Sequence, residues 1–366
     1  MRGFTMILVV AYHVAQECFL QDVKHSSSLP FLVLMRMPLF FFVSGFLAYK
    51  ADFLWTLPSL GRQLWRKTKI QVIPAVVFFF LCIALRSKYN HAWDDFQHNL
   101  AVPTKGGYWF TWVLLQMFVI YYLFSWLVAT FNRWRDRRRN LSTEVASDAV
   151  PLQQSPALSR NLGFWLVIWL VSLVIYATTY MPSWFHYHEA AFYSYCSLIQ
   201  TMRFMQFFLL GNMVHRCWPQ VQRMMDSRWF FPVASTLVFL CCVDVLRWHY
   251  LRLQWTNLPR TIAMYGLVML TVTVFRHYAD YLTEEHRLGR WLQFIGRRTL
   301  DIYLIHFILM PRIPEVGQWL NAHQPNFLLE FVMSVALGLV VIGACLLVSN
   351  ILRVSPFFKL YFFGRK

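Results

Sequence analysis

The sequence predicts an all-α, polytopic integral membrane protein with about ten transmembrane helices and both termini in the cytoplasm. Three observations predict this fold class. Of the 366 residues 58% are hydrophobic and only 14% are charged, whereas soluble domains carry about 25% charged residues. Apolar runs near the length of a membrane-crossing helix recur along the chain, and the basic residues gather between them. No internal repeat interrupts the pattern, so we expect one domain over residues 1–366.

The apolar runs give the expected spans. They cover residues 4–19, 29–49, 70–85, 109–131, 162–180, 197–214, 229–247, 258–275, 292–310 and 327–352. The first run is short for a span. No A-x-A-like cleavage site follows it, so we interpret it as a retained helix rather than a signal peptide. Because it begins almost at Met1, we expect the natural chain to start some residues upstream.

The distribution of basic residues predicts the orientation. With both termini and the even-numbered connections inside, 24 of the 34 Lys and Arg residues lie inside and 8 lie outside. Cytoplasmic loops are enriched in Lys and Arg, so this asymmetry supports an even number of spans. Residues 133–160 are rich in charge, Ser, Pro and Gln, and we expect them to form a flexible cytoplasmic linker.

Composition also excludes several classes of partner and site. The net charge of +17 is explained by topology and anionic lipid, so we predict no nucleic-acid partner. The seven cysteines form no CxxC pair, which argues against a disulfide framework or a zinc site. His186, His188 and Glu189 have the spacing of metal ligands, but no third distant ligand is implied. We therefore predict a polar exterior loop there and no metal.

Two ionisable residues interrupt the first two apolar runs. His13 lies within MILVVAYHVA, and Arg36 lies within LPFLVLMRMPLFFFVSGF. A charge at the centre of a membrane helix costs roughly 2.5–3.5 kcal/mol on insertion scales, which makes such residues candidates for function. The alternative is that each caps a helix end or binds a lipid headgroup. Pro38 follows Arg36 closely, so we expect the second helix to be kinked or unwound there.

The surroundings of these residues form recognisable motifs. Arg2-Gly3 is followed by an aliphatic run that ends at His13. Arg36 stands ahead of Pro-Leu-Phe-Phe-Phe-Val-Ser-Gly, which ends at Gly45. We expect the small residues at the end of this string to permit close helix packing.

Three further motifs follow in order. Trp109-Phe110 opens a middle helix, and Arg203 precedes an aromatic-rich stretch that ends at Gly211. The last motif is IGRRTLDIYLIHF, which supplies Gly296, Thr299, Tyr303 and His306.

With these motifs the chain resembles acyltransferase family 3, the integral-membrane O-acyltransferases. The resemblance covers nearly the whole chain. It departs in one place, since members usually carry an acidic residue shortly before Arg-Gly.

The resemblance implies transfer of an acyl group, most simply acetyl, from acetyl-CoA or another acyl-CoA to a hydroxyl of a sugar, glycan or lipid-linked sugar. CoA is then a substrate, and no permanently bound cofactor is expected. Such transfer needs a base for the hydroxyl proton and a stabiliser for the oxyanion. We assign His13 as the base. Glu17, four residues on, either orients the ring or is a loop-facing charge.

Arg36 is the second catalytic candidate and also a candidate donor-binding residue, because a planar guanidinium suits a phosphate or a polarised carbonyl. Its alternative role is a clamp between spans. Arg203 either contacts coenzyme A or bonds a broken helix end. Trp109, Tyr303 and His306 complete the candidate donor site, with packing as the alternative for His306.

Two other function classes compete. A secondary transporter or flippase also has buried charges and kinked helices, but such proteins usually contain repeats. A structural scaffold does not explain the buried ionisable groups. We predict location in the cell membrane, inner or plasma, among membrane lipids, and the sequence does not predict the oligomeric state.

Overall fold

The computed structural model describes residues 1–366 except 24, 52, 87–91, 145–160, 180–190, 244, 246–257, 356–357, 359–361 and 363–366. Within the described residues the secondary structure is helical and contains no strand, which confirms the predicted all-α class.

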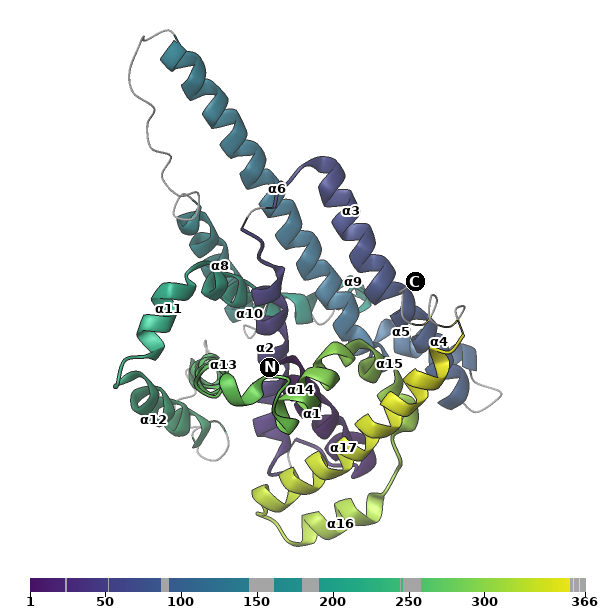
Figure 1. The fold of residues 1–366 in the computed structure, drawn as a ribbon. Coiled ribbons are helices and arrows are strands. Elements are labelled where there is room, and N and C mark those ends of the chain that lie inside the picture. Colours follow the sequence, from purple (N-terminus) through teal and green to yellow (C-terminus); the bar gives the residue numbers. More distant parts are fainter. Residues whose placement is uncertain are drawn as a thin grey trace.

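The main helices follow the chain in the order drawn in Figure 1. They are α1 (Arg2–His13), α2 (Leu29–Ala48), α3 (Leu57–Lys67), α4 (Ile73–Arg86), α5 (Ala92–Ala101), α6 (Trp109–Glu144), α8 (Leu162–Thr178), α9 (Ala191–Tyr195), α10 (Leu198–Arg216), α11 (Trp218–Met225), α12 (Phe230–Val243), α13 (Leu258–His277), α14 (Arg287–Arg297), α15 (Thr299–Leu309), α16 (Pro314–Ala322) and α17 (Phe327–Leu352). Short π-helical turns follow α1 (Val14–Cys18) and α3 (Thr68–Val72), and 3₁₀ turns precede α6 (Lys105–Gly107) and α14 (Asp280–Leu282).

Five helices of the described chain are long and apolar enough to cross a membrane. They are Leu29–Ala48, Leu57–Leu85, Trp109–Arg138, Leu258–His277 and Phe327–Leu352. The pair α11 and α12, bent by 83°, makes six if it counts as one span. These spans show a membrane protein. The predicted number of ten, and the cytoplasmic side of both termini, stay predictions.

The remaining predicted spans correspond to shorter, less apolar or broken helices. The first becomes α1 and its π-helical turn, and the span at 162–180 becomes α8, which has 17 residues. The span at 292–310 is divided between α14 and α15. The break falls at Arg298, whose guanidinium turns to Asp301 in the first turn of α15. A charged side chain and its partner therefore interrupt a segment that hydropathy alone predicts as one continuous span.

Two other expectations differ in detail from the structure. The second helix, α2, is continuous from Leu29 to Ala48, so its backbone does not unwind at Pro38. The helix α6 continues to Glu144, which makes the first part of the expected linker helical; residues 145–160 lie outside the described residues. Figure 1 shows this end of α6 projecting beyond the bundle.

The helices α1 and α2 form the centre of the bundle. The first packs against α2, α14, α15 and α17, and the second against α10 and α13. The helices α2 and α10 are in close contact, because a Cβ placed on Gly45 or Gly211 would overlap the backbone of the other helix. This confirms the packing role expected for Gly45.

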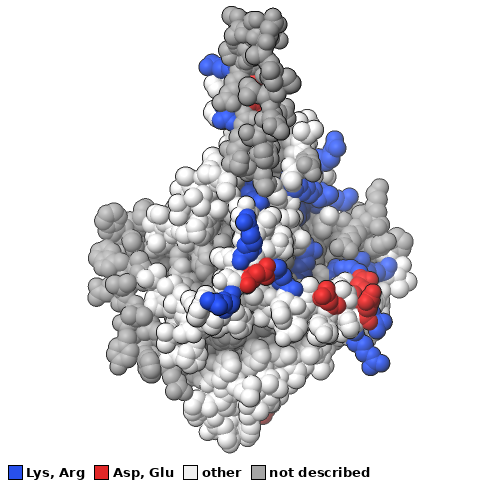
Figure 2. All heavy atoms as spheres, turned by 60° about the vertical axis from the view of Figure 1, so that its left-hand side comes forward, with Lys and Arg blue, Asp and Glu red and all other residues white. Residues whose placement is uncertain are grey.

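The basic residues are unevenly distributed over the surface. Figure 2 shows Lys and Arg in the upper and middle parts of the molecule, while the lower end of that view is almost entirely white. In Figure 1, which shares the same vertical axis, α16 lies at this lower end. The end with few basic residues therefore carries one of the connections predicted to face outward.

Candidate active site

His13 is the last residue of α1, and the π-helical turn Val14–Cys18 follows it directly. π-helical turns are rare and occur often at functional sites. The side chain is 9% exposed and faces α15, where its ring centroid lies 5.4 Å from that of His306 and 4.7 Å from that of Phe307. Its Nδ1 atom has no hydrogen-bond partner among the described residues.

Arg36 lies close to His13 because it contacts the ring of Tyr12, the residue before His13. The guanidinium carbon is 3.4 Å from the centroid of the Tyr12 ring, and Arg36 is also 9% exposed. A cation over an aromatic face, removed from water, is held by the ring quadrupole. The stacking fixes the plane of the guanidinium, and its Nε has no hydrogen-bond partner among the described residues. The structure thus brings together the two residues that interrupt the first two apolar runs.

His306 and Tyr303 extend this cluster along α15. The Nδ1 atom of His306 lies 2.7 Å from the carbonyl oxygen of Tyr303. Because a carbonyl only accepts, we assign a proton on Nδ1 to this hydrogen bond. The Tyr303 hydroxyl donates to the carbonyl of Gly107 at 2.8 Å. Both side chains are buried.

The other predicted site residues have partners or positions of their own. Trp109 stacks with Phe204 at 6.0 Å, and Arg203 donates from Nε to the Thr179 hydroxyl at 3.3 Å. Arg203 therefore has a partner at the end of α8, which agrees with the alternative expectation that it bonds a helix end rather than coenzyme A. Glu17 is half-buried in the π-helical turn and does not bond Nδ1 of His13.

Phe307 lies next to His13, and Tyr108 and Gly107 lie next to Phe307; all three were absent from the predicted site. Phe307 packs between His13 and Tyr108, whose ring centroid is 5.8 Å away. Gly107 has a φ of 97°, and a Cβ there would overlap the Phe307 ring. The Gly-Gly pair at 106–107 was the available signal, because adjacent glycines mark a turn or a close approach. It did not reveal the partner, which lies some 200 positions away.

In a comparison with known families, the model of an acyltransferase domain, that of acyltransferase family 3, matches residues 1–350. The chain belongs to acyltransferase family 3. A search of curated proteins and a search of solved structures each find no match to it. The protein is therefore a membrane acyltransferase, and the transporter interpretation has no support from this comparison.

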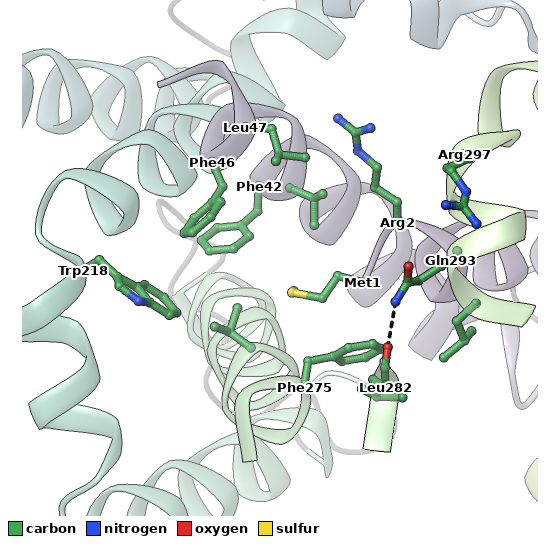
Figure 3. Close-up of a pocket in the computed structure, with 15 residues that line it drawn as sticks. Met1, Arg2, Phe42, Phe46, Leu47, Trp218, Phe275, Leu282, Gln293 and Arg297 are labelled. Carbon is green, nitrogen blue, oxygen red and sulfur yellow. Dashed lines mark hydrogen bonds between the residues drawn. The ribbon is translucent and has the colours of Figure 1, made fainter. Parts of the chain in front are cut away.

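The acyltransferase has a pocket of about 410 Å³ at the start of α1, which we call the inner pocket. Figure 3 shows its apolar wall, which includes Phe42, Phe46 and Trp218, and the side chains of Arg2 and Arg297 at its rim. The mixture of an apolar wall and a few polar groups is typical of small-molecule sites.

More cations surround the start of this acyltransferase's first helix. Lys67 lies over the ring of Phe118 at 3.8 Å and within electrostatic range of Arg66, Arg2 and Lys50. None of these four cations forms an ion pair within the described part of the chain. Four like charges without acidic partners repel one another, so the arrangement favours a polyanionic ligand.

The described residues contain no group of three or more His, Cys, Asp or Glu side chains placed to hold a metal ion. The HxHE sequence at 186–189 lies outside the described residues.

Proposed function

We propose that this acyltransferase moves an acyl group, most simply acetyl, from acyl-CoA to a hydroxyl of a sugar or glycan precursor, including a lipid-linked sugar. The observation that carries the proposal is the buried pair of His13 and Arg36 in the centre of the bundle. A base and an oxyanion-stabilising cation, both removed from water, are the two groups that acyl transfer needs.

His13 acts as the general base. The Nδ1 atom of His13, which has no hydrogen-bond partner in the part of the chain that the structure describes, is available to accept the proton of an incoming hydroxyl. As that proton moves to His13, the hydroxyl oxygen forms a bond to the thioester carbonyl carbon, and the C–S bond then breaks. The thiolate of CoA leaves and takes the proton from the imidazolium, so the step balances and His13 returns to its neutral form.

Arg36 stabilises the negative charge. Its guanidinium is fixed in plane by Tyr12, so its remaining N–H donors point in set directions. The carbonyl oxygen of the thioester gains charge as the tetrahedral intermediate forms, and a preorganised cation lowers the energy of that state.

The inner pocket is the proposed donor site. The phosphates of CoA match the cations Arg2, Lys50, Arg66 and Lys67, and the pantetheine arm matches the apolar wall. His13 lies about 16 Å along α1 from Arg2 at 1.5 Å per residue. The extended arm of CoA would lead the thioester from the phosphate site toward the base. Because CoA is made in the cytoplasm, this proposal also places the inner pocket on that side of a cell membrane.

The test combines donor binding with acyl transfer. Calorimetry on purified protein gives the Kd of acetyl-CoA, and radiolabelled acetyl-CoA added to membranes of the native host reports transfer to the host's own acceptor. We expect His13→Ala to lower transfer by about 10²- to 10⁴-fold while the Kd stays near wild type. Arg36→Lys should also lower transfer with a smaller effect on the Kd, because an ammonium does not reproduce the planar fork that meets the developing oxyanion.

A matched control separates chemistry from folding. Gly343→Ala adds one methyl group to α17 at a position with nothing within 4 Å, so it should bind and transfer like wild type. All variants are compared at equal amounts in the membrane. A wild-type protein that neither binds acetyl-CoA nor transfers label would refute the proposed function. Normal transfer by His13→Ala would show that His13 is not the general base.

A further inference from the structure

A second, more polar pocket of about 230 Å³ lies between α4, α5 and the turn before α6. We call it the outer pocket. The helix α4 supplies an apolar wall that includes Ile83, and α5 supplies Asp95 and Asn99. The turn supplies Gly106 and Tyr108. A carboxylate and an amide facing an apolar wall form a site for a ligand with several hydrogen-bonding groups.

The turn that closes the outer pocket is fixed by Lys105. Its ammonium donates to the carbonyls of Leu100, Val102 and Ser194, the last at 3.0 Å. These bonds connect the end of α5 to α9 and hold Lys105 and Gly106 at φ values of 49° and 56°. The pocket therefore has a preformed wall.

The outer pocket is separated from His13 by two aromatic rings. Tyr108 lines the pocket and is held by its hydroxyl, which donates to the Leu304 carbonyl at 2.9 Å. The ring of Phe307 lies 5.8 Å from Tyr108 and 4.7 Å from His13. The rings of Tyr108 and Phe307 must therefore both shift for a ligand in the pocket to reach the proposed base.

The two pockets approach His13 from opposite ends of α1. The inner pocket contacts Arg2 and Gly3, at the start of the helix, whereas Phe307 contacts His13 at its end. The helix α15 leads from the inner pocket toward His13, as α1 does. It begins shortly after Gly296, which lines the inner pocket, and it carries Phe307 eleven residues after Gly296. A donor in the inner pocket therefore leaves the outer pocket available to the second substrate.

Aromatic side chains that adjoin the wall of the outer pocket indicate the class of that substrate, since the ring centroid of Phe96 lies 5.9 Å from that of Phe79, which lines the pocket. Trp93 is 66% exposed and stacks on Phe96 at 5.3 Å, which in turn stacks on Phe80 at 5.0 Å. An exposed aromatic face packs against the C–H face of a sugar ring, while a carboxylate and an amide bind its hydroxyls. The volume is below the roughly 300–1,000 Å³ of pockets for drug-sized ligands, so it suits one ring rather than several.

We propose that the outer pocket is the acceptor subsite and binds one hydroxyl-rich ring of the glycan, with Asp95 and Asn99 as its hydrogen-bonding groups. The inference rests on the proposed function, because it names the second substrate of the same His13. Asp95 and Asn99 are binding residues here, and neither reaches the reacting atoms.

The test compares three substitutions and one control. Asp95→Asn and Asn99→Ala remove hydrogen-bonding capacity, and Ile83→Phe fills the pocket without changing its charge. The control is Asp94→Asn, which removes the same charge one position away, at an exposed residue that does not line the pocket. The measurements are transfer of radiolabelled acetyl from acetyl-CoA to the acceptor in native membranes and the Kd of acetyl-CoA.

The expected result is a loss of transfer of about tenfold or more in Asp95→Asn and Ile83→Phe, with acetyl-CoA binding unchanged. Asn99→Ala should lose less, and Asp94→Asn should match wild type. Millimolar methyl glucoside, used as a sugar probe, should slow transfer by wild type more than by Asp95→Asn. If wild type transfers label and all three pocket variants transfer it equally well, the subsite is refuted while the proposed function stands. If wild type transfers none, the function itself fails.

Discussion

Replacing Gly211 by alanine should destabilise the protein at the contact between α2 and α10. A Cβ on Gly211 would lie 2.8 Å from the backbone nitrogen of Phe46 and closer still to the carbonyl oxygen of Phe42. Ordinary Cβ contacts begin near 3.4 Å. The obstructing atoms are backbone, so no side-chain rotation relieves the overlap, and the two helices must separate.

The magnitude follows from two opposing terms. Overpacking a tight contact costs about 1–3 kcal/mol, and occasionally more. Alanine favours a helix over glycine by about 1 kcal/mol, and this gain applies equally at Gly343, where the Cβ meets nothing. Because the helix-propensity gain is the same in both variants, it cancels, and the difference in unfolding free energy between Gly211→Ala and Gly343→Ala is about 1–3 kcal/mol.

Titration of the purified protein with SDS, followed by circular dichroism, measures this difference. Gly45→Ala provides a repeat of the experiment from the other helix, since its Cβ would lie 2.6 Å from the carbonyl carbon of Phe208. Because α2 carries Arg36, transfer activity should fall with stability in both variants. Equal unfolding free energies for Gly211→Ala and Gly343→Ala would refute the close contact.

Three further predictions concern topology, the link between the last helices, and pH. A reporter fused at Gln154 should behave as cytoplasmic, and periplasmic activity of that reporter would contradict the predicted orientation. Asp301→Ala should lower the unfolding free energy by about 3 kcal/mol in the same SDS titration, because it removes the buried partner of Arg353 at 2.7 Å; a change below about 0.5 kcal/mol would contradict this. Arg276 holds the pKa of the Asp226 carboxyl below its usual value, so this pair stabilises the fold above pH about 4, and the contribution is lost as the pH falls below that value. The difference in Tm between wild type and Asp226→Asn should accordingly shrink on going from pH 6 to pH 3, and a constant difference would argue against the pair.

Hydropathy predicts the helices of this chain well, because each membrane helix must bury a long apolar surface whatever its neighbours are. It fails at Arg298, where one polar contact divides a run into two helices. The number of spans stays a prediction, since hydropathy measures apolar length and does not distinguish a crossing helix from one packed inside the bundle.

The centre of the site was predictable for a similar reason. Placing a histidine or an arginine in apolar sequence costs free energy unless the side chain finds a polar environment. The two residues His13 and Arg36 were therefore expected to share one site. Phe307 was not predictable, because an aromatic residue in an apolar run carries no sign of what it touches. Arg203 illustrates the reverse case, since its local motif was clear but its partner, Thr179, is fixed only by the packing of α8 on α10.

The π-helical turn after His13 has a mechanical consequence. The start of α1 is held where Gly3 meets the backbone of Leu292, and the far end is held where Gly317 meets the backbone of Phe19. In a regular α-helix the number of residues between two such anchors fixes the angle between them about the helix axis. A π-helical turn contains an extra residue and so changes this angle. The turn thus allows both glycine contacts to form at once, and the proposed base, His13, lies where the α-helix meets the π-helical turn. Deleting Ala15 would restore the regular helical rotation and force one anchor to rotate by about 100°, so the packing at the two anchors constrains the length of this turn.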